Sequence, residues 1–193
     1  RKVGSCEFSD ITVFSFHPVK IITTAEGGAV LTNNKLLAEN LILLRSHGVT
    51  RDPNQMIDVS EGGWYYQQIT LGFNYTMTDL QAALGSSQLT RIDGYIEKRN
   101  ELAKRYEQKL CNSPLELPRD YAGTLSAYHL YIVKISESSD SDRFTLFNYL
   151  RSCDIGVNDH YSPVHLQPYY NSLGFAVGDF PVAEQYYSDV ISI

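Results

Sequence analysis

The sequence has little cysteine and no long apolar run. Its three cysteines, Cys6, Cys111 and Cys153, are odd in number, lie far apart and contain no CxxC pair. This pattern argues against a disulfide framework or a cysteine zinc site, and it fits the reducing cytoplasm. No stretch approaches the roughly 20 apolar residues that a membrane-spanning helix needs. We therefore expect neither disulfides nor a membrane-spanning segment.

Basic residues are also scarce. The chain has 16 lysines and arginines against 22 aspartates and glutamates, which gives a net charge of −6. A broad surface for nucleic acid or for an anionic membrane would need the opposite balance, so neither partner is expected. Hydrophobic residues make up 43% of the chain and charged residues 20%, as in ordinary globular proteins.

One lysine stands in unusual surroundings. Lys20 lies between two apolar stretches of β-forming residues, 11–16 and 21–24, and Gly27 and Gly28 precede another apolar run. Apolar surroundings disfavour the charged form of an amine, and a neutral amine is what Schiff-base chemistry requires. Lysines in strand-like sequence more often lie at an edge, with the charge in water. The pattern alone leaves both interpretations open.

The residues around Lys20 are in an informative order. They read Ser-Phe-His-x-x-Lys and then Thr-x-Glu-Gly-Gly-Ala, and three further motifs follow at 45–48, 71–85 and 160–165. All four resemble, in order, segments of the DegT/DnrJ/EryC/StrS family of sugar aminotransferases, which use pyridoxal phosphate. The resemblance implies an α/β fold of the aspartate aminotransferase type, fold-type I.

The resemblance also implies a domain organisation. Residues 1–95 correspond to the end of the large domain that binds pyridoxal phosphate, and residues 96–193 to most of a small C-terminal α/β domain. Members of the family are considerably longer, so the chain is interpreted as a fragment cut at both ends. The family's residues for the pyridine ring and for part of the phosphate site precede the lysine and are not in this chain. We therefore expect the isolated chain to be inactive.

Three residues receive roles at the cofactor by resemblance. Lys20 is implied to bind pyridoxal 5′-phosphate covalently and then to move protons between cofactor and substrate. The Ser15 hydroxyl is implied to donate to the cofactor phosphate. Asn74 is implied to reach the phosphate in the neighbouring subunit of a homodimer. Family members often have an arginine two residues after that asparagine, whereas Thr76 stands here and supplies no charge.

Three further residues are candidates for contacting the substrate. By resemblance, His160 and Tyr161 lie near the nucleotide or sugar. His17 could face the sugar, although an ordinary packed histidine fits the sequence equally well. His160 and His165 could suggest a metal pair, but two ligands without a third nearby make a poor site, so no metal is expected. Gly27 and Gly28 would allow close backbone approach or a positive φ.

The function implied by the resemblance is transfer of an amino group, with glutamate as the expected donor, to a nucleotide-linked 4-keto-6-deoxy sugar. The residues at 45–49 and 71–89 most resemble members that act on a UDP-linked N-acetyl hexose in pseudaminic acid biosynthesis. Two alternatives are a sugar dehydratase with the same cofactor and a non-catalytic dimerisation or binding module. Dehydratases of the family have histidine in place of Lys20, and a module would not need Lys20 and Ser15.

The periodicity of apolar residues predicts the elements. Strands are expected at 11–16, 28–32, 129–135 and 156–161, with a further strand-like stretch at 190–193. Helices are expected at 36–45, capped by Asn34, at 78–110 as one long helix capped by Thr78, at 143–153 and at 183–188. Residues 50–68 and 163–170 are expected to be loops, and 136–142 a polar turn. In the helix at 143–153, three side chains are expected to be buried, those of Phe144, Phe147 and Leu150.

Overall fold

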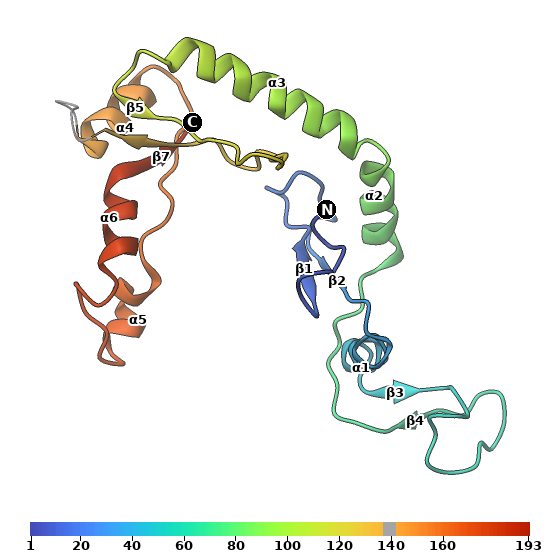
Figure 1. Cartoon of the computed structure of the whole chain (residues 1–193). Coiled ribbons are helices and arrows are strands. Elements are labelled where there is room, and N and C mark those ends of the chain that lie inside the picture. The colour runs from blue at the N-terminus through green and yellow to red at the C-terminus, as the bar shows by residue number, and fades with distance from the viewer. Residues whose placement is uncertain (137–141) are drawn as a thin grey trace. The chain divides into compact units, whose positions relative to one another are not determined.

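The computed structural model describes residues 1–136 and 142–193. The chain divides into two compact units, 1–92 and 93–193 (Figure 1). Across the described residues, no helix is both long enough and apolar enough to cross a membrane. Most of the polar turn expected at 136–142 falls on 137–141, outside the described residues.

The first unit begins with an antiparallel pair of strands. Strands β1 (Thr12–Ser15) and β2 (Gly28–Leu31) pair so that Ser15 lies opposite Gly28. Both strands confirm the prediction. The apolar stretch at 21–24 is not a strand, and it belongs instead to the segment 16–27 that connects β1 to β2, which we call the lysine loop. The pairing of Ser15 with Gly28 therefore fixes the two ends of the segment that contains Lys20.

Helix α1 (Lys35–Arg45) follows, and it confirms the helix expected at 36–45. The Asn34 side chain accepts hydrogen bonds from the backbone N–H groups of Leu36 and Leu37, which is the predicted cap. Two short strands, β3 (Val49–Thr50) and β4 (Gln67–Gln68), pair antiparallel after the helix. The segment between them is a loop, as predicted.

The prediction of one helix over 78–110 is wrong. The structure has α2 (Asp79–Leu89) and α3 (Ile92–Leu110), interrupted at Thr90. The Thr90 hydroxyl donates to the carbonyl oxygen of Ser87 at 2.9 Å, and the Arg91 N–H donates to the Gln88 carbonyl. These bonds span three residues and tighten the last turn of α2, so the helical ladder ends there.

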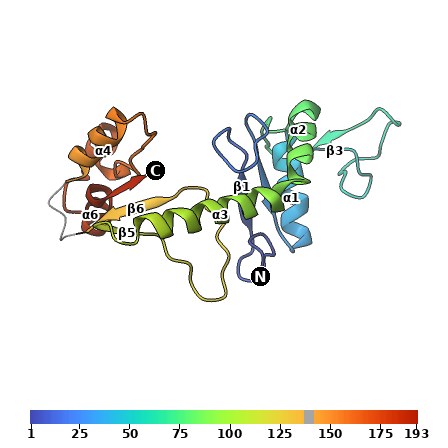
Figure 2. The same ribbon diagram turned by 90° about the horizontal axis from the view of Figure 1, so that it is seen from above.

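The second unit contains a three-stranded antiparallel sheet in the order β5-β6-β7. Its strands are β5 (Leu115–Glu116), β6 (Ile132–Ile135) and β7 (Val190–Ser192). Figure 2 shows α3 running alongside β6, and the core confirms this packing because Ala103 of α3 is buried together with Val133 and Ile191. The strand-like end of the chain predicted at 190–193 is thus the fully buried edge of this sheet.

Helices α4 (Arg143–Ser152) and α6 (Pro181–Asp189) confirm the predictions at 143–153 and 183–188. Within α4, however, Phe144 is 76% exposed, so its expected burial is wrong. Leu146, Phe147 and Leu150 pack against the core instead. The face of α4 that packs against the sheet therefore includes Leu146 in place of Phe144. The buried face is rotated about the helix axis relative to the predicted face, and the apolar periodicity alone does not distinguish the two.

Two other expectations in the second unit are wrong. Residues 156–161 do not form a strand, because their pairing is limited to one isolated bridge between Asn158 and Ser192. Residues 163–170 are not simply a loop. They include a 3₁₀ helix, η1 (Val164–Leu166), and the start of α5 (Pro168–Asn171). Proline at the first position of α5 and of α6 favours helix initiation, because its fixed φ suits a first turn.

Candidate functional site

The lysine loop is closed at its base by hydrogen bonds between its two ends. The Phe16 N–H donates to the Gly27 carbonyl at 2.8 Å. The Phe16 carbonyl in turn accepts from the Thr24 N–H at 3.0 Å and from the Thr23 hydroxyl at 2.8 Å. Lys20 therefore lies near the middle of a short segment whose first and last residues are held together.

Lys20 ends a tight turn inside this loop. Its backbone N–H donates to the His17 carbonyl at 2.9 Å, and the residue is half-buried. His17 is further fixed by two backbone contacts, since its N–H donates to Ser15 Oγ at 3.4 Å and its Nδ1 accepts from the Val19 N–H at 3.4 Å. The structure thus brings three of the predicted site residues, Ser15, His17 and Lys20, into one continuous segment.

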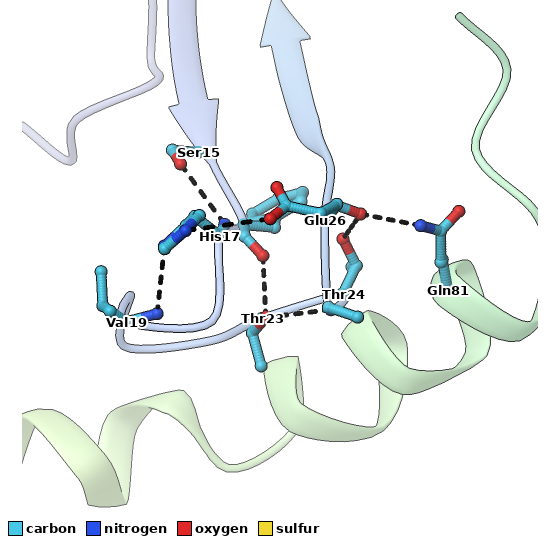
Figure 3. A network of polar contacts seen from close by, with 9 residues as sticks. Ser15, His17, Val19, Thr23, Thr24, Glu26 and Gln81 are labelled. Carbon is cyan, nitrogen blue, oxygen red and sulfur yellow. Dashed lines mark hydrogen bonds and ion pairs between the residues drawn. The ribbon is translucent and has the colours of Figure 1, made fainter.

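His17 is not a buried packing residue, which was one of its two interpretations. Its side chain is half-exposed, and its Nε2 lies 3.8 Å from Oε1 of Glu26 (Figure 3). Ser15 is exposed at the end of β1. A hydroxyl, an imidazole and an amine therefore lie at or near the surface of the same segment, where a small anionic molecule could approach them.

Each of the two glycines of the motif is required for a different local reason. Gly27 has φ +149°, a conformation that residues with a side chain rarely adopt. At Gly28, a Cβ atom would lie 2.6 Å from the Phe14 carbonyl oxygen, so the close pairing of β1 with β2 requires glycine. Both glycines shape the strand pair and its loop.

Helix α2 contacts the lysine loop through two glutamines that sequence reasoning did not single out. Gln81 donates to the Glu26 carbonyl at 3.1 Å, and Gln88 bonds to both backbone groups of Thr23. No signal in a single sequence distinguishes these amides from solvated helix residues, because glutamine is common on exposed helix faces. The contacts became visible only in the structure.

Asn74 lies at a different place in the first unit. Its neighbours Phe73 and Tyr75 donate backbone hydrogen bonds to the carbonyls of Leu44 and Arg45 at 2.6 and 2.9 Å. Asn74 itself is exposed. Its backbone is therefore fixed against the end of α1 while the residue stays accessible, an arrangement that suits contact with another molecule.

In the second unit, His160 is 5% exposed, and neither of its ring nitrogens has a hydrogen-bond partner among the described residues. Its ring meets Tyr161 edge to face, with centroids 4.6 Å apart, and Tyr161 is exposed. Burial lowers the pKa of His160, and the nearby Asp159 opposes this shift. The imidazole is consequently neutral at pH 7 and has both nitrogens available to a partner.

An open groove of about 810 Å³ adjoins His160 and Tyr161. Its other lining is mostly apolar and includes Leu130, Phe180 and Tyr186. Concave apolar surfaces with a few polar groups are typical of sites for small molecules. This groove of the second unit therefore combines a mostly apolar lining with the imidazole of His160 and the hydroxyl of Tyr161.

His165 has a partner of its own. Its Nε2 lies 2.8 Å from Oε1 of Glu184, and the same carboxylate accepts from the N–H of Gly178 at 2.9 Å. The hydrogen bond from His165, followed by that from Gly178, lowers the pKa of Glu184. Across the described residues, no group of three or more His, Cys, Asp or Glu is placed to hold a metal ion.

Comparison with known proteins identifies a family for this chain. The model of the DegT/DnrJ/EryC1/StrS aminotransferase family matches residues 1–193. The chain is 35% identical over 197 residues to the spore coat polysaccharide biosynthesis protein SpsC of Bacillus subtilis. It is 37% identical over 199 residues to the UDP-4-amino-4,6-dideoxy-N-acetyl-β-L-altrosamine transaminase of Campylobacter jejuni. Both alignments cover 100% of this chain, and they cover 50% and 48% of the relatives.

Solved structures give the same result. The sugar aminotransferase Spr1654 from Streptococcus pneumoniae in its PMP form superposes with a TM-score of 0.85 at 30% identity. That match covers 98% of this chain and 47% of Spr1654, whose PLP form matches similarly. The chain thus spans about half the length of the relatives it matches.

Proposed function

The chain belongs to the DegT/DnrJ/EryC1/StrS aminotransferase family, and from this membership we propose that the full-length protein is a pyridoxal-phosphate-dependent aminotransferase acting on a nucleotide-linked keto-sugar. Its fold is the α/β fold of the fold-type I sugar aminotransferases. The observation that supports the activity most directly is Lys20, a half-buried lysine in a loop closed at its base, five residues after an exposed serine.

The residues present fit pyridoxal phosphate by their chemistry. The Lys20 amine is the group that an aldehyde cofactor requires, and the Ser15 hydroxyl is a donor for a phosphate. Asn74 of the partner subunit would add an amide donor to the same phosphate. When bound, the cofactor supplies an electron sink that stabilises negative charge at the reacting carbon.

The role of Lys20 follows from its amine. A neutral amine can bind the cofactor, can leave it again when an amino donor takes its place, and can then accept and return a proton at Nζ. The same residue is therefore proposed to act as nucleophile and as general acid–base. The loop base formed by Phe16, Thr24 and Gly27 keeps the backbone of Lys20 in place while its side chain serves these roles.

The proposed substrate is a UDP-linked 4-keto-6-deoxy sugar, with glutamate as amino donor. The name of the Campylobacter jejuni relative supports a UDP-linked 4-amino-4,6-dideoxy sugar as the product class. We propose that His160 and Tyr161 contact the nucleotide or sugar and that His17 contacts the sugar. The neutral imidazole, whose two nitrogens have no partner in the described part of the chain, and the exposed tyrosine ring suit a base or sugar hydroxyl groups.

The experiment uses the full-length protein. Pyridoxal phosphate is added, the protein is reduced with borohydride, and the modified peptide is located by mass. We expect the adduct on Lys20, its loss in Lys20→Ala, and no change in Lys35→Ala, which removes an exposed lysine of α1. A folded protein without any adduct on Lys20 would favour the non-catalytic module.

Product analysis then tests the reaction. With glutamate and a UDP-linked 4-keto-6-deoxy sugar, an aminotransferase yields the amino sugar and 2-oxoglutarate in equal amounts. A dehydratase would instead use glutamate as the two-electron reductant and release its nitrogen as ammonia, so that one sugar hydroxyl is replaced by hydrogen and the sugar gains no amino group. We also propose that residues 1–193 alone show no turnover, because the family's remaining cofactor contacts precede the lysine.

A further inference from the structure

One face of helix α2 is shaped to fit the lysine loop. The residues of this face are Gln81, Gly85 and Gln88, which are spaced four and three apart and so lie in a line along the helix. Each of them contacts a different residue of the loop, and we call them together the glutamine face. The contacted residues are Glu26, Thr24 and Thr23, all between three and six positions after Lys20.

Gln88 makes the most specific of these contacts. Its Oε1 accepts from the Thr23 N–H at 3.2 Å, and its Nε2 donates to the Thr23 carbonyl at 3.0 Å. A side-chain amide that pairs with both the backbone N–H and the backbone carbonyl of one residue makes the hydrogen bonds that a neighbouring strand would otherwise make. Because the two bonds have opposite donor directions, they fix the position of Thr23 and the orientation of its backbone.

Gln81 holds the end of the loop in a comparable way. Its Oε1 accepts from the Thr78 N–H at 3.0 Å and so completes the capping box of α2. Its Nε2 donates to the Glu26 carbonyl at 3.1 Å (Figure 3). The same side chain therefore connects the start of α2 to the loop, and the two cannot move independently without loss of a hydrogen bond.

Gly85 lies between the two glutamines and permits the close approach. A Cβ atom at this position would lie 2.7 Å from Cγ2 of Thr24, which is closer than carbon atoms pack. Thr24 is itself buried, and its hydroxyl donates to the Glu26 carbonyl. The glutamine face is thus complementary to the loop in shape as well as in hydrogen bonding.

We propose that Gln88 and Gln81 are positioning residues that hold the lysine loop in the conformation from which the Lys20 amine reacts. The inference rests on the proposed function and adds residues that do not contact the substrate themselves. Thr23 is three residues from Lys20, so a shift of its backbone moves the amine. A misplacement of about 1 Å can reduce a rate by about 100-fold, which is why such fixation matters.

The test compares three variants of the full-length protein, Gln88→Leu, Gln88→Glu and the control Ser86→Ala. Ser86 is exposed on the same helix. Amide hydrogen exchange across 20–26 is measured without substrate, as a readout independent of turnover. We expect Gln88→Leu to raise exchange there by about tenfold, which corresponds to the net loss of roughly one hydrogen bond. Ser86→Ala should leave exchange unchanged.

The Gln88→Glu variant separates a hydrogen-bonding role from general destabilisation of the helix. A carboxylate keeps the acceptor for the Thr23 N–H but loses the donor to the Thr23 carbonyl. Protonation restores that donor. We therefore expect the ratio of the exchange rates of 20–26 in Gln88→Glu and in wild type, measured at the same pH, to be above one at neutral pH. This ratio should fall towards one as the pH is lowered and the introduced carboxyl becomes protonated.

The spectroscopic readout concerns Lys20 directly. The visible absorbance of the lysine-bound cofactor is titrated with pH, and kcat and KM are measured with keto-sugar and glutamate. We expect Gln88→Leu to shift the midpoint of the absorbance titration and to lower kcat by about 10- to 100-fold, with KM within about threefold of wild type. A purely structural role would lower the amount of folded protein and leave the midpoint unchanged.

The outcomes distinguish the two proposals. If wild type carries the adduct on Lys20 while Gln88→Leu matches Ser86→Ala in exchange, midpoint and kcat, the positioning role is overturned and the proposed function stands. If wild type carries no adduct on Lys20, the proposed function is overturned and the positioning role falls with it. If wild type carries the adduct on Lys20 and Gln88→Leu shows both faster exchange at 20–26 and a shifted midpoint of the absorbance titration, both proposals are supported.

Discussion

Nε2 of His165 lies 2.8 Å from Oε1 of Glu184, and this pair joins the 3₁₀ helix η1 to the first turn of α6. Glu184 also accepts from the N–H groups of Gly178 and Phe180, and the His165 ring packs on Phe180 with centroids 4.7 Å apart. One carboxylate therefore holds the loop before α6 in place.

The Glu184 carboxylate predicts an acid-sensitive contribution to stability. The hydrogen bonds from His165 and Gly178 lower the pKa of Glu184 in the folded state. A lowered carboxyl pKa means that the stabilisation is present above the unfolded-state pKa and is lost as the pH falls through the folded-state pKa. We expect the denaturant midpoint of the wild-type full-length protein to fall between about pH 5 and pH 3.

At pH 7, Glu184→Gln should unfold at a lower urea midpoint than wild type. On acidification, the urea midpoint of Glu184→Gln should fall by less than that of wild type. Urea titrations at pH 7, 5 and 4 measure both. The control is Glu97→Gln, which changes an exposed glutamate of α3. If Glu184→Gln and Glu97→Gln gave the same pH dependence, the His165–Glu184 pair would have no measurable effect on stability.

His160 predicts a variant in which stability and substrate binding change in opposite directions. A buried imidazole without partners costs free energy, so His160→Phe should unfold at an equal or higher urea concentration than wild type. If a nitrogen of His160 bonds to the substrate, KM for the nucleotide sugar should rise by about tenfold, the usual effect of one lost hydrogen bond.

Because burial keeps His160 neutral, its contribution to KM should not change between pH 7 and pH 8. Steady-state kinetics at these two pH values measure this. Tyr161→Phe serves as the comparison, since it keeps the ring and removes only the hydroxyl. An unchanged KM in His160→Phe would remove His160 from the substrate site.

The Asn34 cap gives a prediction that depends on local structure alone. Its side chain accepts from two N–H groups of α1 that would otherwise lack a partner within the helix. Asn34→Ala should therefore destabilise the protein by about 1 kcal/mol, whereas Asn34→Ser should retain most of the stability. Chemical denaturation of the three proteins at pH 7 measures the difference, and equal midpoints for all three would mean that the cap adds nothing.

The local elements could be predicted where a single feature dominates. The apolar, β-forming residues of β1 and β2, the apolar spacing of α1 and the Asn34 cap each have a short-range signature. The break at Thr90 has no such signature, because the apolar period of the helix continues through it. The bonds that end α2, from the Thr90 hydroxyl to Ser87 and from the Arg91 N–H to Gln88, depend on the folded backbone. Strand pairing at 156–161 failed for a related reason, since pairing depends on a partner strand that periodicity does not identify.

The candidate site shows the same division. Residues in a motif, such as Ser15, His17 and Lys20, could be named as candidates from sequence because the resemblance places them together, and their roles stay predictions. Gln81 and Gln88 were not, because their partners are backbone groups more than 50 residues away in the chain. A contact with a backbone group does not depend on which side chain the partner carries, so no residue type at Thr23 or Glu26 reveals it.

Asn74 leads to a prediction about assembly. If each site contains Lys20 from one subunit and Asn74 from the partner subunit, Lys20→Ala and Asn74→Ala should each be inactive or nearly so as homodimers. In a heterodimer of the two, one site carries both substitutions and the other carries neither. A 1:1 mixture that exchanges subunits forms heterodimers as half of its population. It should therefore recover about a quarter of wild-type activity, as expected for shared sites in a two-fold dimer.

The measurement mixes the two purified full-length variants under conditions that allow subunits to exchange and follows amino-sugar formation over time. Lys20→Ala mixed with Lys20→Ala,Asn74→Ala is the matched control, because every site in that mixture lacks the amine. Recovery in the first mixture alone supports a site shared between subunits. If Asn74→Ala were as active as wild type, or if mixing restored nothing although exchange was shown by mass, Asn74 would have no role across the dimer and the site would lie within one subunit. Thr76→Arg provides a further comparison, since it adds the charge that family members often have two residues after the asparagine.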